Sequence, residues 1–238
     1  MNYSWNWGVL FAEPYLSWII AGVGMTFVIS ICAFVIALAI GASIGTLHST
    51  AHVAGRTLAG IYISVFRNIP LLLQMFIWYF VIPELLPADL GHWVKRDMPC
   101  PEVVTGIVAL ALFTSARVAV QVSAGIAAVP RGQGLAAMAA GMSSAQAYRL
   151  VLLPQAFRII MPPLTSECLT IFKNSSIALT IGVYELTAQT QRIQSQTYQG
   201  FEAFTAATVI YLTIALTVTF TMRTIERRVA IPGTSAGA

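Results

Sequence analysis

Long runs of apolar residues dominate the chain and are separated by shorter polar segments. A helix needs about 20 apolar residues to cross a hydrocarbon core of about 30 Å. Runs of this length predict membrane-spanning helices near residues 20–46, 58–82, 102–127, 165–188 and 204–222. The pattern therefore predicts an all-α polytopic membrane protein with about five transmembrane helices.

Composition agrees with the hydropathy pattern. Hydrophobic residues make up 57% of the 238 residues and charged residues only 9%, whereas a soluble domain carries roughly 25% charged residues. The net charge of +4 comes without the basic, aromatic-interleaved face that a nucleic-acid-binding surface requires. Composition therefore excludes an ordinary soluble domain. It favours a protein embedded in a lipid bilayer and argues against a nucleic-acid partner.

Basic residues outside the predicted spans divide unequally between the two sides of the membrane. Short cytoplasmic loops collect Lys and Arg, so the side with more of them is predicted to be cytoplasmic. The cytoplasmic side would hold Arg56, Arg131, Arg149, Arg158, Arg223, Arg227 and Arg228, and the outer side Lys95, Arg96 and Arg192. This count predicts that the N-terminus lies outside and the C-terminus inside.

Between the third and fourth predicted spans the chain stays on the cytoplasmic side over residues 128–164, longer than a simple connector requires. Pro130, together with Gly132 and Gly134, is expected to break the third span. The segment LAAMAAGM then predicts a short alanine-rich helix, and Gly141 permits its C-terminal turn. Small side chains and Met are typical of a surface that packs closely against another protein. A hairpin without a partner is the alternative.

A second helix is predicted to follow in the same loop. Ser143 or Ser144 can cap it, AQAYRLVLL continues it, and Pro154 is expected to end or kink it. The predicted divisions of the chain are an outer N-terminal segment (1–19), a transmembrane domain (20–228) containing this loop, and a disordered tail (229–238).

The spacing from Gly141 to Val151, Leu153 and Pro154 resembles the coupling loop of importer-type ABC transporter permeases. We therefore call residues 128–164 the coupling loop. The resemblance implies a MetI-like fold and a short helix that docks on a separate ATPase subunit. The implied coupling residues are Ala136, Ala137, Gly141, Ser143, Leu153 and Pro154. Leu135 stands where the family usually has Glu.

Two further segments extend the resemblance to the polar amino-acid permeases of that superfamily. They are VFRNIPLLLQMFIWYFVIPELLP in the second span and FKNSSIALTIGVYEL in the fourth. Within that group, FRNIPL, WYFVIPELLP, LFTSARV and VPRGQ are most similar to the glutamate/aspartate import permeases. Import of a neutral or basic amino acid is the alternative within the family.

The resemblance implies an inner-membrane permease subunit rather than an enzyme. Its implied partners are a second homologous permease subunit, two ABC ATPase subunits, a periplasmic substrate-binding protein and an amino-acid substrate. The chain has no G-x-x-x-x-G-K-[ST] nucleotide motif, so no cofactor is expected in it and ATP would be bound by the separate ATPase subunits.

Charged residues inside the predicted spans are candidates for function, because an unpaired charge in the bilayer interior is costly. Arg67, Arg117 and Lys173 are cationic, and Glu167 and Glu185 are anionic. The surplus of one positive charge would suit a dicarboxylate substrate of net charge −1. In the alternative interpretation, Arg67 and Lys173 pair with Glu167 or Glu185 or extend to an interface.

The resemblance separates the roles of two cations. Arg67 belongs to a motif shared by permeases for different substrates, which implies binding of the common α-carboxylate or a scaffold role. Arg117 is the more selective candidate, because the matching position in many amino-acid permeases is aromatic. Val120 and Ser123 replace a Glu and an Arg that the family often has in its third span.

Pro70 is expected to bend the second span, and broken helices near the midplane commonly form substrate sites. Neutral polar groups nearby in the spans can bind an amino-acid backbone, although each can equally form an interhelix hydrogen bond. The predicted substrate pathway comprises Arg67, Asn68, Pro70, Gln74, Arg117, Lys173, Asn174, Ser175 and Glu185.

Other classes of function have weaker signals. His48 and His52 are spaced to share a helical face but have no third metal ligand nearby. Ser43 lies in GASIG, which matches G-x-S-x-G but sits in a membrane span, where Gly41 and Gly45 instead indicate close helix packing. The rival classes of function are therefore an intramembrane enzyme and a simple channel.

Overall fold

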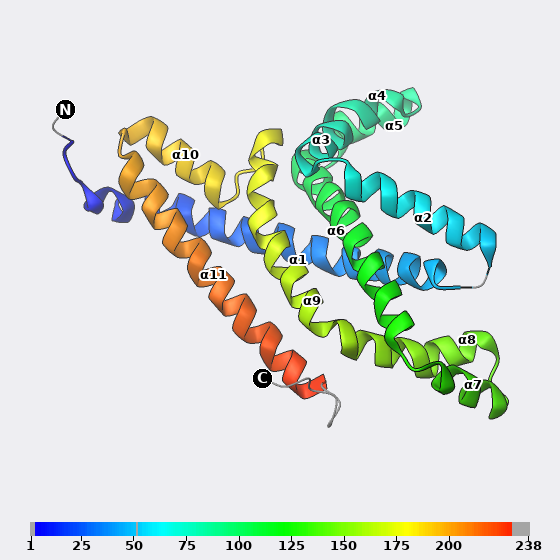
Figure 1. Ribbon diagram of the computed structural model, residues 1–238. Helices are drawn as coiled ribbons and strands as arrows, with labels where there is room; N and C mark the ends of the chain where they lie inside the picture. The colour runs from blue at the N-terminus through cyan, green and yellow to red at the C-terminus, as the bar shows by residue number, and fades with distance from the viewer. Residues whose placement is uncertain (1–2, 51, 230–238) are drawn as a thin grey trace. The chain divides into compact units, whose positions relative to one another are not determined.

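The computed structural model describes residues 3–50 and 52–229, and within these ranges the chain forms helices and no β-strands (Figure 1). This confirms the predicted all-α class. The predicted tail at 229–238 lies outside the described residues except for Val229, the last residue of α11.

Three helices are long and apolar enough to cross a membrane: α1 (Tyr15–His48), α6 (Pro101–Ala128) and α11 (Gly200–Val229). They match three of the predicted spans, and α1 begins before the expected start at residue 20. A fourth candidate is a bent pair formed by α2 (Val53–Asn68) and the segment Leu71–Leu85. The predicted second span is therefore broken at Ile69 and Pro70, as the proline indicated.

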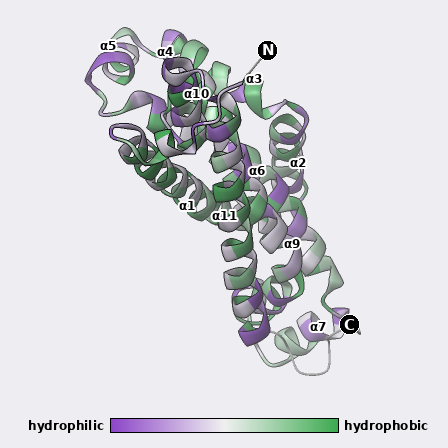
Figure 2. Cartoon of the chain, turned by 90° about the vertical axis from the view of Figure 1, so that its left-hand side faces the viewer, coloured by the Kyte–Doolittle hydropathy of each residue, from purple (hydrophilic) through white to green (hydrophobic). Residues whose placement is uncertain are grey.

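The long helices differ in how much apolar surface the chain itself covers. In the most apolar 18-residue window of α6, 56% of the residues are buried, compared with 28% in α1 and 22% in α11. Figure 2 shows the mainly hydrophobic colouring of α1 and α11. Apolar side chains on these two helices are thus left for lipid or a protein partner, whereas α6 is a core helix.

The predicted span at 165–188 is not one helix. Helix α9 runs from Leu153 to Asn174 and is followed by a 3-10 helix, η5 (Ser175–Ile181). The Ser175 hydroxyl donates to the Phe172 carbonyl at 2.7 Å, and Gly182 then adopts φ +91. Serine hydroxyls that bond nearby carbonyls compete with regular helical bonding, which is a physical reason for the helix to end inside an apolar stretch.

Shorter elements complete the chain, and several join without a break. The bounds are η1 (Trp7–Phe11), α3 (Leu71–Phe76), η2 (Ile77–Val81), α4 (Ile82–Leu85), α5 (Ala88–His92), η3 (Trp93–Asp97), α7 (Arg131–Ala139), α8 (Ser144–Ala147), η4 (Tyr148–Leu152) and α10 (Leu186–Thr197). Of these, η1 is a 3-10 helix, and η2, η3 and η4 are π-helical.

The chain divides into two compact units. The first contains Met1–Val35, Ile69–Ala111 and Thr170–Thr217, and the second contains Ile36–Asn68, Leu112–Leu169 and Val218–Ala238. Residues of α1, α6, α9 and α11 therefore belong to both units.

The core of the second unit lies between α6 and α9. Its buried residues are Val118, Val122, Ile126, Val129, Ala156, Ile160 and Leu164. Gly125 of α6 allows a close approach, because a Cβ there would lie 2.6 Å from Cγ2 of Ile160. Gly41 and Gly45 of α1 approach α6 equally closely. This confirms the helix-packing interpretation of the G-x-x-x-G spacing.

In the first unit, α10 packs on α1. A Cβ on Gly22 would lie 3.0 Å from Cα of Leu186, and the Leu186 amide donates to Oγ1 of Thr26 at 3.2 Å. The segment before α1 is hydrogen-bonded to α11. The Tyr3 hydroxyl donates to the buried Glu202, which also accepts from the Asn6 amide at 2.7 Å. Desolvation and the hydrogen bond to Glu202 raise the pKa of the Tyr3 phenol above its ordinary value.

Candidate functional site

The first half of the coupling loop is a helix with a defined C-terminal turn. Helix α7 ends at Ala139, and Gly141 follows with φ +86. The Met142 amide donates to the Ala137 carbonyl at 3.1 Å, and the Gly141 amide to the Met138 carbonyl at 3.0 Å. These two bonds form a Schellman motif, whose left-handed residue is most often glycine. Gly141 therefore ends the helix as predicted.

The start of α7 differs in one detail from the prediction. Helix α6 ends at Ala128, before Pro130, as expected. Gly132 and Gly134, however, lie inside α7 instead of breaking the chain. Pro130 directly precedes α7, and its extended backbone (ψ 130) separates the two helices.

The second half of the loop begins with a capping box. Ser143 accepts from the Gln146 amide at 3.3 Å, and the Gln146 side chain accepts from the Ser143 amide at 2.8 Å. Helix α8 continues through η4 into α9 without interruption. Pro154 therefore does not end the helix, contrary to one predicted possibility. The π-helical turn directly before it widens the helix, which gives the proline ring room that a regular α-turn lacks.

The coupling loop carries apolar side chains on an exposed surface. Leu135 is 63% exposed, and Met138 and Leu150 are also exposed. A hollow of about 440 Å³ is lined by Leu135, Met138, Leu152 and residues around Pro130. Ala137 is buried, whereas Ala136, Gly141, Ser143 and Pro154 are exposed and Leu153 is half-buried. An exposed apolar surface with polar surroundings is typical of a docking site for another protein.

The loop is also attached to the end of α1. Tyr148 of η4 donates its hydroxyl proton to the Ser49 carbonyl at 3.0 Å, and its ring packs against the core between α6 and α9. This contact joins residues 99 positions apart in the sequence. No local sequence pattern indicated it.

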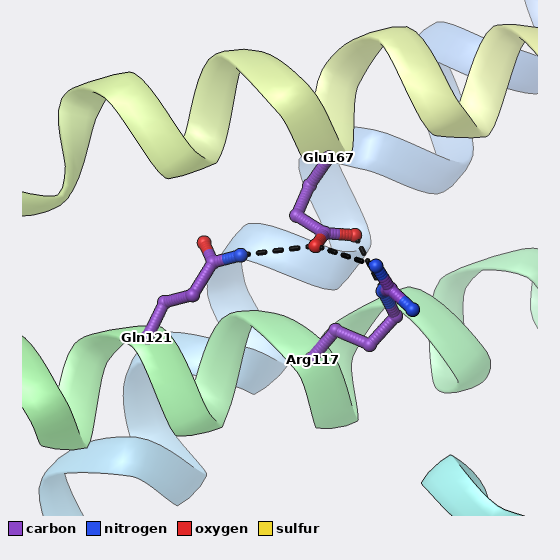
Figure 3. A network of polar contacts seen from close by, with 3 residues as sticks. All are labelled: Arg117, Gln121 and Glu167. Carbon is purple, nitrogen blue, oxygen red and sulfur yellow. Dashed lines mark hydrogen bonds and ion pairs between the residues drawn. The ribbon is translucent and has the colours of Figure 1, made fainter.

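Three polar residues of the second unit form a network between α6 and α9 (Figure 3). Arg117 donates from Nε to Oε2 of Glu167 at 2.7 Å and from Nη2 to Oε1 at 3.0 Å. Gln121 donates from Nε2 to Oε1 at 3.0 Å. The Glu167 side chain is 6% exposed and that of Arg117 is 41% exposed. The buried carboxylate thus has its charge compensated and accepts three hydrogen bonds.

This network contradicts the pairing considered for Glu167 from the sequence. The sequence left Arg67 and Lys173 as alternatives, but the carboxylate pairs with Arg117. Gln121 was not predicted, although it follows Arg117 by four residues and so lies on the same helical face. That spacing was the available signal.

Arg67 and Lys173 occupy corresponding places at two helix ends. Arg67 lies in the last turn of α2 and Lys173 in the last turn of α9. Both side chains are exposed, and neither forms an ion pair with any residue in the described ranges. A cation in the last helical turn is favoured by the helix dipole, and both remain available to an anion.

The neutral candidates differ in their surroundings. Pro70 is exposed, directly before α3, and Asn68, the last residue of α2, is also exposed. Gln74 is buried and donates from Nε2 to the Ile69 carbonyl at 2.9 Å, across the helix break. Helix α3 packs against η5, which begins with the buried Ser175 next to the half-buried Asn174.

Glu185 is fully buried and caps α10. Its Oε1 accepts from the Ala188 amide at 2.8 Å, and its Oε2 accepts from the Thr187 amide at 3.0 Å and from the Tyr211 hydroxyl at 2.7 Å. A carboxylate at a helix N-terminus stabilises the helix through its unpaired amides and its dipole. These contacts employ both oxygens within the protein.

The residues proposed for other chemistries have structural contacts. His48 bonds to Ser123 through Nδ1 at 3.1 Å, and Nδ1 of His52 accepts from the Gly55 amide at 3.3 Å. Ser43 donates to the Ala39 carbonyl at 2.9 Å within α1. The described residues contain no group of three or more His, Cys, Asp or Glu placed to bind a metal.

Comparison with known proteins defines the class of this chain. Residues 51–231 match the family described as binding-protein-dependent transport system inner membrane component, and the chain belongs to this family. It is therefore an inner-membrane transport component and not an enzyme. A permease of this family acts together with a partner permease, an ATPase and a binding protein.

Individual relatives are similar over most or all of their lengths. The chain is 41% identical to the glutamate/aspartate import permease protein GltJ of Escherichia coli strain K12, with both chains covered completely. It is 31% identical to the arginine transport system permease protein ArtQ of Bacillus subtilis strain 168, over 90% of this chain and 94% of that one.

Solved structures confirm the fold. The crystal structure of an amino acid ABC transporter with histidines contains a chain that is 33% identical, with a TM-score of 0.76 over 96% of this chain and all of that chain. The inward-facing MetNI methionine ABC transporter gives a TM-score of 0.73 at 20% identity, which shows the MetI-like fold alone.

Proposed function

We propose that this chain is the permease subunit of an ATP-driven ABC importer for acidic amino acids, glutamate and aspartate. The observation that carries the proposal is the 41% identity over the complete lengths of this chain and a glutamate/aspartate import permease. The arginine permease, at 31% identity, represents the alternative of a basic substrate.

The charges in the predicted spans support an anionic substrate. Glu167 is neutralised by Arg117, and the Glu185 carboxylate is engaged at the N-terminus of α10. Arg67 and Lys173 have no carboxylate partner among residues 3–50 and 52–229. A substrate with two carboxylates and one ammonium group would compensate this surplus positive charge, which a basic amino acid would increase.

We assign the candidate residues to two roles. Arg67, Asn68, Pro70, Gln74, Arg117, Lys173, Asn174 and Ser175 contribute to the substrate pathway, and Glu185 maintains the start of α10 instead of binding substrate. Regular α-helical structure ends at Asn68 and at Asn174, and interrupted helices of this kind commonly form substrate sites in transporters. Arg117 is the residue that favours an acidic side chain.

The assembly follows from the same proposal. The N-terminus lies on the outer side, where a binding protein delivers substrate, and the C-terminus lies in the cytoplasm. The permease pairs with a similar subunit, and two ATPase subunits dock on residues 134–155. ATP-driven closure of the ATPases moves the coupling loops together and changes access from inward to outward, and hydrolysis reverses the change.

The function is tested by uptake of labelled glutamate into vesicles that contain the complete complex and its loaded binding protein. We expect ATP-dependent uptake that aspartate inhibits and that histidine and arginine do not. Uptake that proceeds equally without ATP would indicate a channel. Equal inhibition by neutral or basic amino acids would disprove the acidic assignment within the permease family.

Replacing Arg117 by tyrosine is expected to weaken the binding of acidic substrates selectively. Loss of a charge-assisted contact to a carboxylate should weaken glutamate and aspartate binding by about tenfold or more, with little change for glutamine. Displacement of labelled amino acids from the purified permease–ATPase complex measures this. An equal loss of binding affinity for all amino acids would contradict a selectivity role for Arg117.

A further inference from the structure

The guanidinium of Arg117 uses only one of its edges within the protein. Nε and one N–H of Nη2 donate to Glu167. A guanidinium carries five N–H donors in a planar fork, so the two N–H groups of Nη1 and one of Nη2 remain. None of them meets an acceptor among the described residues. This second edge has the geometry for bidentate contact with another carboxylate.

Glu167 fixes the direction of that edge. It holds the guanidinium by two bonds to two different oxygens, which restrains rotation of the planar group. Its own side chain is 6% exposed and lies on α9, whereas Arg117 lies on α6 and remains 41% exposed. The carboxylate is therefore the buried anchor, and the guanidinium is the accessible group.

Gln121 shows that the carboxylate organises its surroundings. Figure 3 shows its Nε2 directed toward Glu167 and its Oε1 directed away. That Oε1 is buried and has no hydrogen-bond partner in the described part of the chain. An unpaired buried acceptor is costly. The amide thus gives Glu167 a third donor while its own oxygen stays unsatisfied.

We propose that Glu167, supported by Gln121, is a positioning residue that presents the free Nη1/Nη2 edge of Arg117 to a substrate carboxylate. This inference rests on the proposed function and adds two residues that position its substrate-binding guanidinium. Neither residue contacts the substrate in this scheme. The ion pair also lowers the cost of keeping Arg117 in the membrane when no substrate is bound.

A double-mutant cycle tests whether Glu167 acts through Arg117. The readout is the Kd of labelled glutamate for the purified permease–ATPase complex without binding protein. Because glutamine forms at most one of the two bonds to the guanidinium, we expect Glu167→Gln to raise Kd about tenfold. Arg117→Gln should raise it further, and the double variant should match Arg117→Gln alone. A double variant whose rise in Kd equals the product of the two single-variant rises would overturn the proposal.

A charge swap separates positioning from a structural ion pair. The variant that combines Arg117→Glu with Glu167→Arg restores an ion pair between α6 and α9, so thermal stability should recover toward wild type. The guanidinium would then stand on α9, and we expect glutamate binding to stay impaired. A swapped complex that binds glutamate with wild-type Kd would show that the pair is only structural.

Gln121→Met is the milder variant if the others fail to assemble. It keeps the ion pair but removes one donor to Glu167, so a Kd rise of about two- to fivefold is expected. An unchanged Kd would overturn the proposal. Glu84→Gln is the matched control, because it removes an exposed ion pair between Glu84 of α4 and Lys95 of η3 and should leave Kd unchanged.

Failure of the positioning role can be distinguished from failure of the proposed function. If the wild-type complex does not import glutamate or aspartate, the proposed function fails, and the positioning role that rests on it fails with it. Independent effects of Glu167 and Arg117 in a complex that does import glutamate overturn the positioning role alone. If the wild-type complex imports amino acids but binds none measurably without its binding protein, the positioning role is overturned while the proposed function stands.

Discussion

Replacing Gly45 by valine is expected to remove most of the correctly folded protein. A Cβ at Gly45 would lie 2.5 Å from the Ala119 carbonyl oxygen and 2.8 Å from Cβ of Val122, both on α6. A backbone oxygen cannot yield as a flexible side chain does, so α1 would have to separate from α6. Overpacking of this kind costs about 1–3 kcal/mol or more, a large fraction of a typical folding free energy.

Gly24→Val is the matched control for this prediction. It makes the same change in the same helix, but a Cβ at Gly24 meets nothing within 4 Å. The measurement is the yield of monodisperse protein by size-exclusion chromatography in detergent, together with its Tm. We expect Gly24→Val to resemble wild type. Equal behaviour of the two variants would mean that α1 and α6 do not pack at Gly45.

The sequence predicted best those features that depend on local composition. The apolar run at 102–127 corresponds closely to α6, Pro101–Ala128, because hydropathy alone determines such a helix. Pro70 and Gly141 marked a helix break and a helix end because their backbone restrictions act locally. Gly41 and Gly45 likewise indicated close packing before the facing helix was known.

Features that depend on distant or subtle contacts escaped prediction. The end of α9 at Asn174 lies inside an apolar stretch, where hydropathy averages hide serine hydroxyls that bond nearby carbonyls. The partner of Arg117 is 50 residues away, and the sequence offered three cations for two anions without a rule for pairing them. The π-helical turn before Pro154 likewise has no local sequence signature.

Replacing Gly141 by valine is expected to lower ATP-driven uptake by about tenfold or more while the protein still inserts. Gly141 has φ +86, and a Cβ there meets nothing within 4 Å, so the cost comes from the backbone alone. Left-handed backbone costs an ordinary L-residue about 1–2 kcal/mol, and β-branched residues tolerate it least. Valine would therefore open the Schellman turn and misplace the helix capped by Ser143 relative to α7.

Gly132→Val separates backbone strain from added bulk. Gly132 lies inside α7, and a Cβ there also meets nothing within 4 Å, but its φ is not in the left-handed region. Uptake, ATPase activity and co-purification of the ATPase subunits should stay near wild type in this control. Gly141→Asn should fall between the two valine variants, because asparagine tolerates the left-handed region better than other residues with a side chain. Preserved uptake in Gly141→Val would show that the turn does not serve coupling.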